Sequence, residues 1–279
     1  MYQPILIYLN VISKEKKQLR RYSLINMKVK SKISAAYLFH FTPRKESLIN
    51  ILRNHFMPFY CMERLDYLSL KNNNNDYFEM AFPLVCFCDI PNPLQATHRK
   101  KFGTYGIGLD KSWGIKNGLT PIIYTHSNTI LSSNLKYLVD LYPKLENYGV
   151  PKSEILGLRN HISYLMMHYK SYEGFAYKKD EKRFDEEITR FYDEREWRYI
   201  PLNCNNLKLN LERDEYESID KLKEENEKIQ KCNKLTFQLS DIKYLCLNAE
   251  SEIQSFLNAL SDRYSENDLK ILKSLIHLL

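Results

Sequence analysis

Residues 192–201 (YDEREWRYIP) constrain the fold more than any other stretch, because charged and aromatic side chains alternate along them. Successive side chains of a β-strand point to opposite faces, so a strand here places Glu194, Glu196 and Arg198 on one face. The other face, which we expect to turn toward the core, carries Arg195, Trp197 and Tyr199. Two carboxylates beside a guanidinium suit chemistry that stabilises a developing positive charge. The alternative is a solvated strand face with a cross-strand salt bridge.

The composition is typical of a globular protein that lies outside the membrane. The chain has 279 residues, of which 44% are hydrophobic and 13% aromatic, enough for one large domain or two small ones. No run approaches the 18 apolar residues of a transmembrane helix, and the apolar start lacks the flanks of a signal peptide. The six Cys include Cys86 and Cys88 but no CxxC pair. We therefore expect a cytoplasmic protein with reduced cysteines and no metal.

The positive charge is concentrated at the N-terminus. The chain has 41 Lys and Arg against 34 Asp and Glu, and residues 1–34 hold eight of these bases but only one acid, Glu15. The remaining 33 bases and 33 acids balance, so we divide the chain into a basic arm (1–34) and one domain (35–279). Such an arm suits contact with nucleic acid or another acidic partner. The alternative is a dispensable extension.

Short strands and helices alternate irregularly along the domain, which predicts the α+β class. The glycines of 103–109 indicate close backbone approach to a ligand or to a neighbouring element. Residues 60–80 and 172–177 are expected to be loops, and 205–235 a charged helical excursion. The expected strands are 36–41, 84–88, 103–109, 120–124, 194–200 and 242–247. The expected helices are 43–55 after an N-cap at Thr42, 111–117 after an N-cap at Asp110, 129–142, 155–169, 212–230, 250–260 and 268–279.

Motifs for several common activities are missing from the sequence. It contains no GxGxxG, GxxxxGK[ST], HExxH or GxSxG. Nucleotide handling by a P-loop or a Rossmann domain is therefore unsupported. His161 and His168 lie seven residues apart on an expected helix, where a position on the helix surface or at the edge of the core is a simpler explanation than a metal site.

Six segments taken in order resemble the AbiGi family of abortive phage infection proteins. They are FHFT (39–42), VCFCDIP (85–91), YGIGLDKSWG (105–114), PIIY (121–124), YDEREWRYIP (192–201) and DIKYLCL (241–247). The resemblance covers roughly residues 35–260. It implies a role in phage defence within a two-gene module that resembles a toxin–antitoxin pair.

The same order of motifs is similar, more distantly, to the ADP-ribosyltransferase fold of DarT-like toxins, which act on DNA. In that fold a first-strand His and its hydroxyl neighbour bind the adenosine ribose of NAD. Here His40 and Thr42 match that motif. A late-strand Glu stabilises the oxocarbenium-like transition state, and Glu196 matches it. Glu194 precedes it by two residues, where related transferases place a residue that governs the acceptor.

The resemblance implies roles for three further residues. A middle-strand aromatic that stacks on nicotinamide corresponds to Tyr105, with Phe87 as the second candidate. Arg198 would pair with the pyrophosphate or orient Glu196. For His40, the alternative is a strand histidine whose ring nitrogen is satisfied by a backbone carbonyl.

The resulting expectation is an ADP-ribosyltransferase-like domain of short strands flanked by helices. Its expected function in phage defence is NAD-dependent transfer of ADP-ribose to a macromolecule. The alternative is a non-catalytic antitoxin, since AbiGi proteins hold that role in their modules. Such an antitoxin would bind a partner toxin, of the nucleotidyltransferase type, or nucleic acid.

Overall fold

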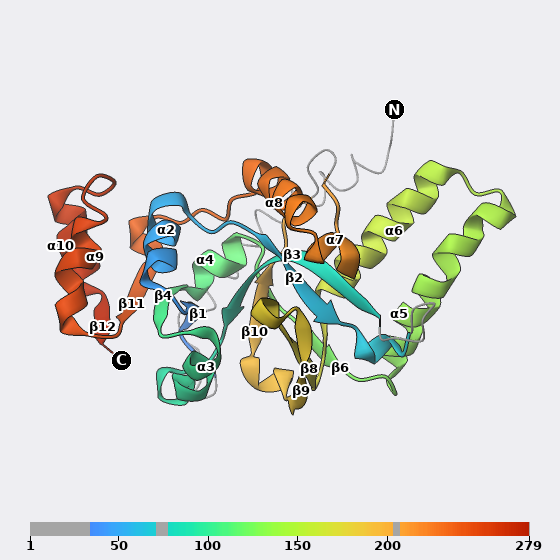
Figure 1. Ribbon diagram of the computed structural model, residues 1–279, viewed down its shortest axis with the longest axis horizontal. Coiled ribbons are helices and arrows are strands. Elements are labelled where there is room, and N and C mark those ends of the chain that lie inside the picture. The colour runs from blue at the N-terminus through green and yellow to red at the C-terminus, as the bar shows by residue number, and fades with distance from the viewer. Residues whose placement is uncertain (1–33, 71–77, 203–206, 279) are drawn as a thin grey trace.

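One central β-sheet organises the molecule, whose computed structural model describes residues 34–70, 78–202 and 207–278. The strand order is β12-β11-β4-β1-β3-β10-β5, and β2 pairs with β3 beside this path (Figure 1). All pairs are antiparallel except β11 with β12. The strands are β1 (Tyr37–Thr42), β2 (Phe59–Arg64), β3 (Glu79–Cys88), β4 (Tyr105–Asp110), β5 (Thr120–Pro121), β10 (Glu196–Tyr199), β11 (Ile242–Leu247) and β12 (Ile276–Leu278).

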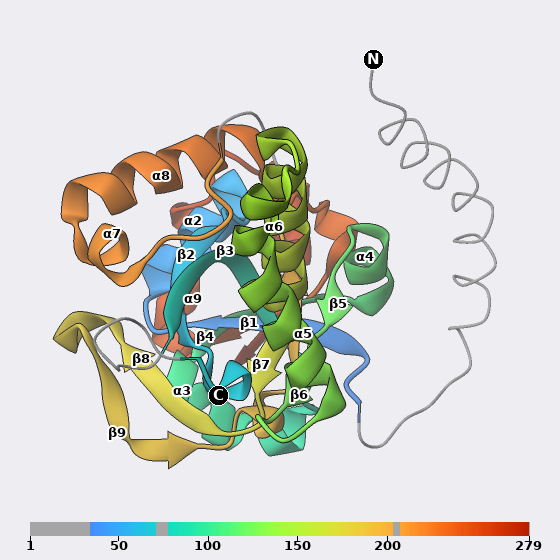
Figure 2. The same ribbon diagram turned by 90° about the vertical axis from the view of Figure 1, so that its right-hand side faces the viewer.

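Two smaller sheets accompany the central one. The parallel pair joins β6 (Ile123–Thr125) to β7 (Tyr169–Ser171), and the antiparallel pair joins β8 (Gly174–Lys178) to β9 (Arg183–Thr189). Figure 2 shows the β8–β9 hairpin extending along one side of the molecule, below α7 and α8. β6 and β7 have three residues each, and β8 and β9 have five and seven, so both pairs depend on packing against neighbouring elements.

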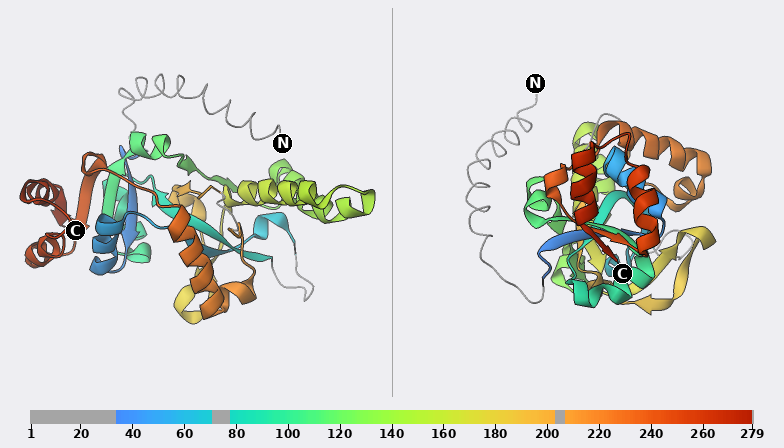
Figure 3. Two further views of the ribbon diagram at one scale, coloured as in Figure 1. Left: turned by 90° about the horizontal axis from the view of Figure 1, so that it is seen from above. Right: turned by 90° about the vertical axis from the view of Figure 1, so that its left-hand side faces the viewer.

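Helices lie at both ends of the sheet and also along its length (Figure 1). α9 and α10 lie beside β11 and β12, whereas α5 and α6 form a projecting pair at the opposite end (Figures 1 and 3). The helices are α2 (Lys45–Asn54), α3 (Gln95–Phe102), α4 (Lys111–Lys116), α5 (Ile130–Leu141), α6 (Lys152–Met167), α7 (Arg213–Glu217), α8 (Ile219–Cys232), α9 (Ile253–Asn258) and α10 (Glu266–Ser274). The 3₁₀ turns are η1 (Asp66–Leu68), η2 (Asn92–Leu94), η3 (Tyr142–Tyr148), η4 (Lys179–Glu181), η5 (Phe191–Glu194), η6 (Leu239–Asp241) and η7 (Glu250–Glu252).

Two main clusters of buried apolar side chains hold these elements together. The first packs α2, α4, α9 and α10 on the β1–β4–β11 part of the sheet and includes the buried side chains of Trp113 and Phe256. The second packs α5, α6, α7 and α8 on β2 and β3, with Phe82, Met166 and Ile229 fully or almost fully buried. Burial of such side chains contributes about 1.5–3 kcal/mol each.

The central sheet parts between β1 and β3. β1 pairs with β4 along its whole length, but its register with β3 contains only Phe39 opposite Cys88. β3 instead pairs with β10 from Cys88 back to Val85, and with β2 from Leu84 back to Glu79. The strands β1 and β3 therefore diverge beyond one pair and leave space between them.

The glycines near β4 serve close packing within the protein. Gly103 has φ of +114°, and a Cβ there would lie 2.2 Å from the Thr42 carbonyl carbon. At Gly108 a Cβ would lie 2.7 Å from the Phe39 ring. Of the two explanations for these glycines, close approach to a neighbouring element is therefore the one observed.

The α+β class expected from the sequence is confirmed, and several elements fall where they were predicted. β11 matches the predicted 242–247 strand, and α4 begins after Asp110, whose carboxylate accepts the Ser112 N–H at 2.9 Å. Other boundaries were wrong. Residues 60–80 contain β2 and the start of β3, 174–178 form β8, and 120–124 divide between β5 and β6. Thr42 ends β1, and Arg44 is the residue before α2.

The expected burial of the late strand was also wrong, because its two faces are exchanged. Glu196 and Arg198 are buried, whereas Trp197 and Tyr199 are only partly buried. Glu194 is not on this strand but at the end of η5. The predicted 212–230 helix is divided into α7 and α8, whose Tyr216 and Ile229 are buried in the core. The basic arm, except residue 34, lies outside the described residues.

Candidate functional site

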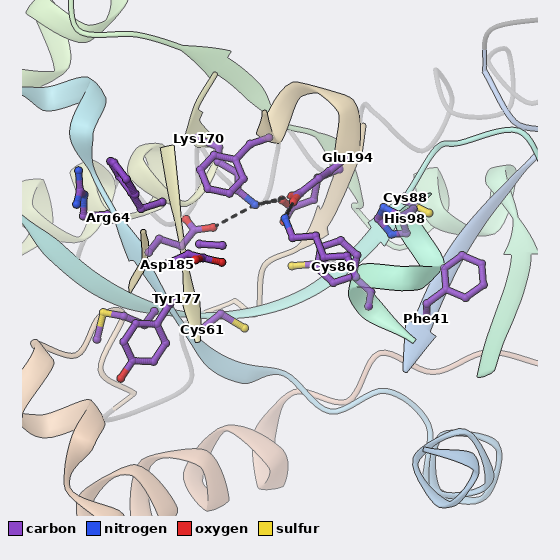
Figure 4. Close-up of a pocket in the computed structure, with 18 of the residues that line it drawn as sticks. Phe41, Cys61, Arg64, Cys86, Cys88, His98, Lys170, Tyr177, Asp185 and Glu194 are labelled. Carbon is purple, nitrogen blue, oxygen red and sulfur yellow. Dashed lines mark hydrogen bonds and ion pairs between the residues drawn. The ribbon is translucent and has the colours of Figure 1, made fainter. Parts of the chain in front are cut away.

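A cavity of about 560 Å³ opens where β1 and β3 part, within the size range of small-molecule sites. Figure 4 shows Lys170 and Glu194 in the middle of the cavity, with Arg64, Asp185 and Tyr177 on one side of them and His98 and Phe41 on the other. Six phenylalanines line it: Phe39, Phe41, Phe87, Phe102, Phe175 and Phe191. Its charged lining residues are Glu63, Arg64, Lys101, Lys170, Lys178, Asp185, Glu194 and Glu196, with His40 and His98 as the imidazoles.

Lys170 joins the carboxylates of the cavity wall. Its ammonium donates to Glu194 Oε2 at 2.9 Å and to Glu196 Oε2 at 2.8 Å, and lies 3.9 Å from Glu63. Lys101 from α3 donates to the other Glu194 oxygen. Both Glu194 oxygens are therefore engaged by cations of the chain itself.

Arg198 neutralises the other side of this cluster from behind the wall. Its side chain is fully buried, and its Nε donates to Glu196 Oε1 at 2.7 Å. The terminal nitrogens donate to both oxygens of Glu63 and to the Met167 carbonyl, the latter at 2.7 Å. A buried guanidinium needs such a complete set of acceptors, because each unmet donor would carry a desolvation penalty.

The electrostatics of this ion cluster keep Glu196 and Lys170 charged at neutral pH. Burial by itself would raise the pKa of Glu196, but Arg198 and Lys170 more than offset this and hold the pKa below its usual value. For Lys170, burial would lower the pKa, yet Glu194, Glu196 and Glu63 raise it well above its usual value. The wall therefore presents paired charges, not a free carboxylate or a neutral amine.

The turn before β10 brings the two glutamates together. Arg195 adopts a left-handed conformation with φ of +45°, and its carbonyl accepts the Asp89 N–H at 3.0 Å. The Glu196 N–H donates to the Tyr124 hydroxyl at 2.8 Å. Glu194 therefore reaches Lys170 from a 3₁₀ turn and Glu196 reaches it from a strand. The sequence prediction paired the two glutamates for a different reason, the alternation of side chains along one strand.

His40 lines the cavity and joins β1 to β3 across the gap. Its Nδ1 lies 2.8 Å from the Cys86 carbonyl oxygen, so this nitrogen carries the proton and donates to it. Burial lowers the pKa of the imidazole below its ordinary value. His40 is therefore a strand histidine satisfied by a backbone carbonyl, which was the alternative to ligand binding. It also lines the cavity.

The other predicted ligand-binding residues divide into two groups. Phe87 lines the cavity and packs against Phe56 with ring centroids 5.0 Å apart. Thr42 and Tyr105 are not among the lining residues, and the Tyr105 hydroxyl donates to Glu252 at 2.8 Å. Arg198 contacts Glu196 from behind the wall. Tyr105, the residue expected to stack on nicotinamide, therefore does not line the cavity that His40 and Glu196 share.

Sequence reasoning missed several residues of this site. Glu63 and Lys170 are in the ion cluster, and His98 and Lys101 line the cavity from α3. The spacing of His98 and Lys101, three residues apart on a helix, could have indicated a shared face. Glu63 and Lys170 have no local signal, because they join the cluster from β2 and β7, which are distant from Glu196 and Arg198 in the sequence.

The described residues contain neither a cluster of metal-ligating side chains nor a membrane-spanning helix. In these ranges no group of three or more His, Cys, Asp or Glu side chains is placed to hold a metal ion. Cys61, Cys86, Cys88 and Cys246 have free thiols. Within the described part of the chain, no helix has both the length and the apolarity needed to cross a membrane.

Fold and site together define a mixed α+β protein with an aromatic cavity and a buried, internally paired ion cluster. A family model described as "Putative abortive phage resistance protein AbiGi, antitoxin" matches residues 54–248, which include Glu63, Lys170, Glu196 and Arg198. This chain belongs to the AbiGi family, as the sequence motifs predicted.

A curated relative agrees with this assignment. The "Abortive phage resistance protein AbiGi" of Lactococcus lactis subsp. cremoris is 28% identical over 240 residues, covering 80% of this chain and 96% of the relative. No solved structure matches this chain.

Proposed function

We propose that this chain acts in phage defence as the antitoxin of an abortive-infection pair, neutralising a partner toxin by binding. The description of the matching family model supports this role. The structural observation that carries the proposal is the state of Glu196. Both of its oxygens are engaged by Arg198 and Lys170 at 2.7–2.8 Å, so its charge is already balanced within the protein.

That balance favours binding over catalysis. A carboxylate stabilises an oxocarbenium-like transition state through charge directed at the reacting carbon. Here the two cations nearest Glu196 reduce the field that it presents to the cavity. An antitoxin needs no such field.

Growth measurements separate the two roles. An antitoxin expressed alone leaves growth unchanged and restores it when the second gene of the pair is co-expressed. The Glu196→Gln variant should protect as well as wild type if it folds, and exposed Glu186→Gln is the matched control. Growth arrest by the chain alone, removed by Glu196→Gln but not by Glu186→Gln, would contradict the antitoxin proposal.

The second candidate is NAD-dependent ADP-ribosyl transfer to a macromolecule. It is favoured by one observation, that His40, Phe87, Glu194 and Glu196 line the same cavity. In this reaction the bond between nicotinamide and ribose breaks and an acceptor nucleophile bonds to the ribose carbon. Nicotinamide and the acceptor's proton are released. Lys170 would have to shift from Glu196 when substrate binds.

Nicotinamide release from NAD, measured by chromatography, tests this candidate. Glu196→Gln should lower the rate about 10²–10³-fold, the usual loss for one such electrostatic group. His40→Ala should chiefly weaken NAD binding. Absence of NAD binding by wild-type protein would eliminate the candidate.

Nucleic-acid binding by the basic arm stays a prediction. If the arm contacts phosphates, deletion of residues 1–26 should weaken binding and flatten its salt dependence.

A further inference from the structure

Helix α3 supplies one wall of the cavity through two residues on the same face. His98 and Lys101 are three residues apart and both line the cavity, with His98 labelled beside Phe41 in Figure 4. Lys101 is engaged by Glu194, so its role in the ion cluster is clear. Nothing described so far uses His98.

His98 combines aromatic neighbours with free hydrogen-bonding capacity. Its ring centroid lies 4.4 Å from that of Phe102 and 5.8 Å from that of Phe41. Among the described residues, neither ring nitrogen has a hydrogen-bond partner. Burial, the largest of several influences, lowers the pKa of His98 to about 4. The neutral ring therefore keeps one N–H donor and one nitrogen acceptor at physiological pH.

The carboxylates of the cavity are already matched by cations. Glu194 pairs with Lys101 and Lys170, and Asp185 pairs with Lys178 at 3.1 Å. Arg198 pairs with both Glu63 and Glu196. The lining as a whole carries four basic and four acidic side chains. A charged group entering beside α3 would compete with these pairs, whereas an uncharged group would leave them intact.

We propose that the part of the cavity wall formed by His98 and Phe102 of α3 and by Phe41 of β1 binds an uncharged nucleobase. Rings of this kind stack on aromatic side chains and present adjacent donors and acceptors at their edges. His98 offers one donor and one acceptor at a fixed position, which matches such an edge. The proposal concerns the cavity of the second candidate function, but it requires no cleavage or transfer.

Calorimetric titration with the neutral nucleosides adenosine, guanosine, cytidine and uridine tests this site. We expect at least one of them to bind wild-type protein. His98→Phe keeps the stacked ring but removes both nitrogens, so it should weaken binding by about tenfold or more. The exposed α6 residue His161 provides the matched control, and His161→Phe should bind as wild type does.

A second readout keeps the test decisive if His98→Phe folds poorly. The imidazole NMR resonances of His98 in wild-type protein should shift on nucleoside addition, whereas those of His161 should not. Failure of all four nucleosides to bind at millimolar concentration, or equal binding by His98→Phe, would overturn the proposal. Nucleoside binding without nicotinamide release from NAD would support it and reject the transferase. NAD cleavage that His98→Phe leaves unaffected would support the transferase and count against the nucleobase site.

Discussion

Replacing Arg198 by methionine is the most direct perturbation of the ion cluster. Methionine fills much of the same space, but it leaves Glu63 and Glu196 without their principal cation. Arg198 is fully buried and makes hydrogen bonds to both carboxylates and to the Met167 carbonyl. Removing one partner from such a buried pair typically costs about 3–5 kcal/mol. We expect a loss of this size in the free energy of unfolding.

Urea denaturation followed by circular dichroism measures this loss. Arg159→Met is the matched control, because Arg159 is exposed on α6, and it should change stability by less than about 0.5 kcal/mol. Adding Glu63→Gln to Arg198→Met should recover part of the loss, since one unpaired carboxylate is neutralised. A loss below about 1 kcal/mol for Arg198→Met, in a protein that unfolds in one transition, would refute the reasoning that Arg198 compensates buried charge.

Three further predictions concern other features of the structure. Gly103→Ala should abolish soluble expression, because its Cβ would overlap the β1–α2 connection, whereas Gly157→Ala in α6 meets no atom within 4 Å and should raise stability by about 0.5–1 kcal/mol in the same denaturation assay. His40→Ala should lower stability by about 1–3 kcal/mol by leaving the Cys86 carbonyl unpaired, and an unchanged urea midpoint would contradict that role. The pKa of Glu196 is lowered in the folded protein, so its stabilising effect is complete above the unfolded pKa of about 4.3 and is lost as pH falls. The stability difference between wild type and Glu196→Gln should therefore shrink from pH 6 to pH 3, and a constant difference would show that the carboxylate charge is not responsible.

The sequence by itself determined the class of the fold and several of its elements, because their signals are local. The Asp110 cap and the apolar run 242–247 each lie within a few residues, and α4 and β11 follow from them. It also identified Glu194 and Glu196 as a pair of carboxylates close in space. Motif order along the chain was enough to recognise the AbiGi family.

Only the tertiary structure decided which face of β10 is buried and what surrounds its carboxylates. Alternation shows that Glu196 and Arg198 share a face but not whether that face meets solvent. The answer depends on Glu63 in β2, which binds Arg198 from more than 130 residues away in the sequence, and on Lys170 in β7, which binds Glu196 from about 25 residues away. His98 enters the cavity for a similar reason, because the separation of β1 from β3 is a property of the whole sheet. Long-range pairing sets these contacts, and no local pattern encodes it.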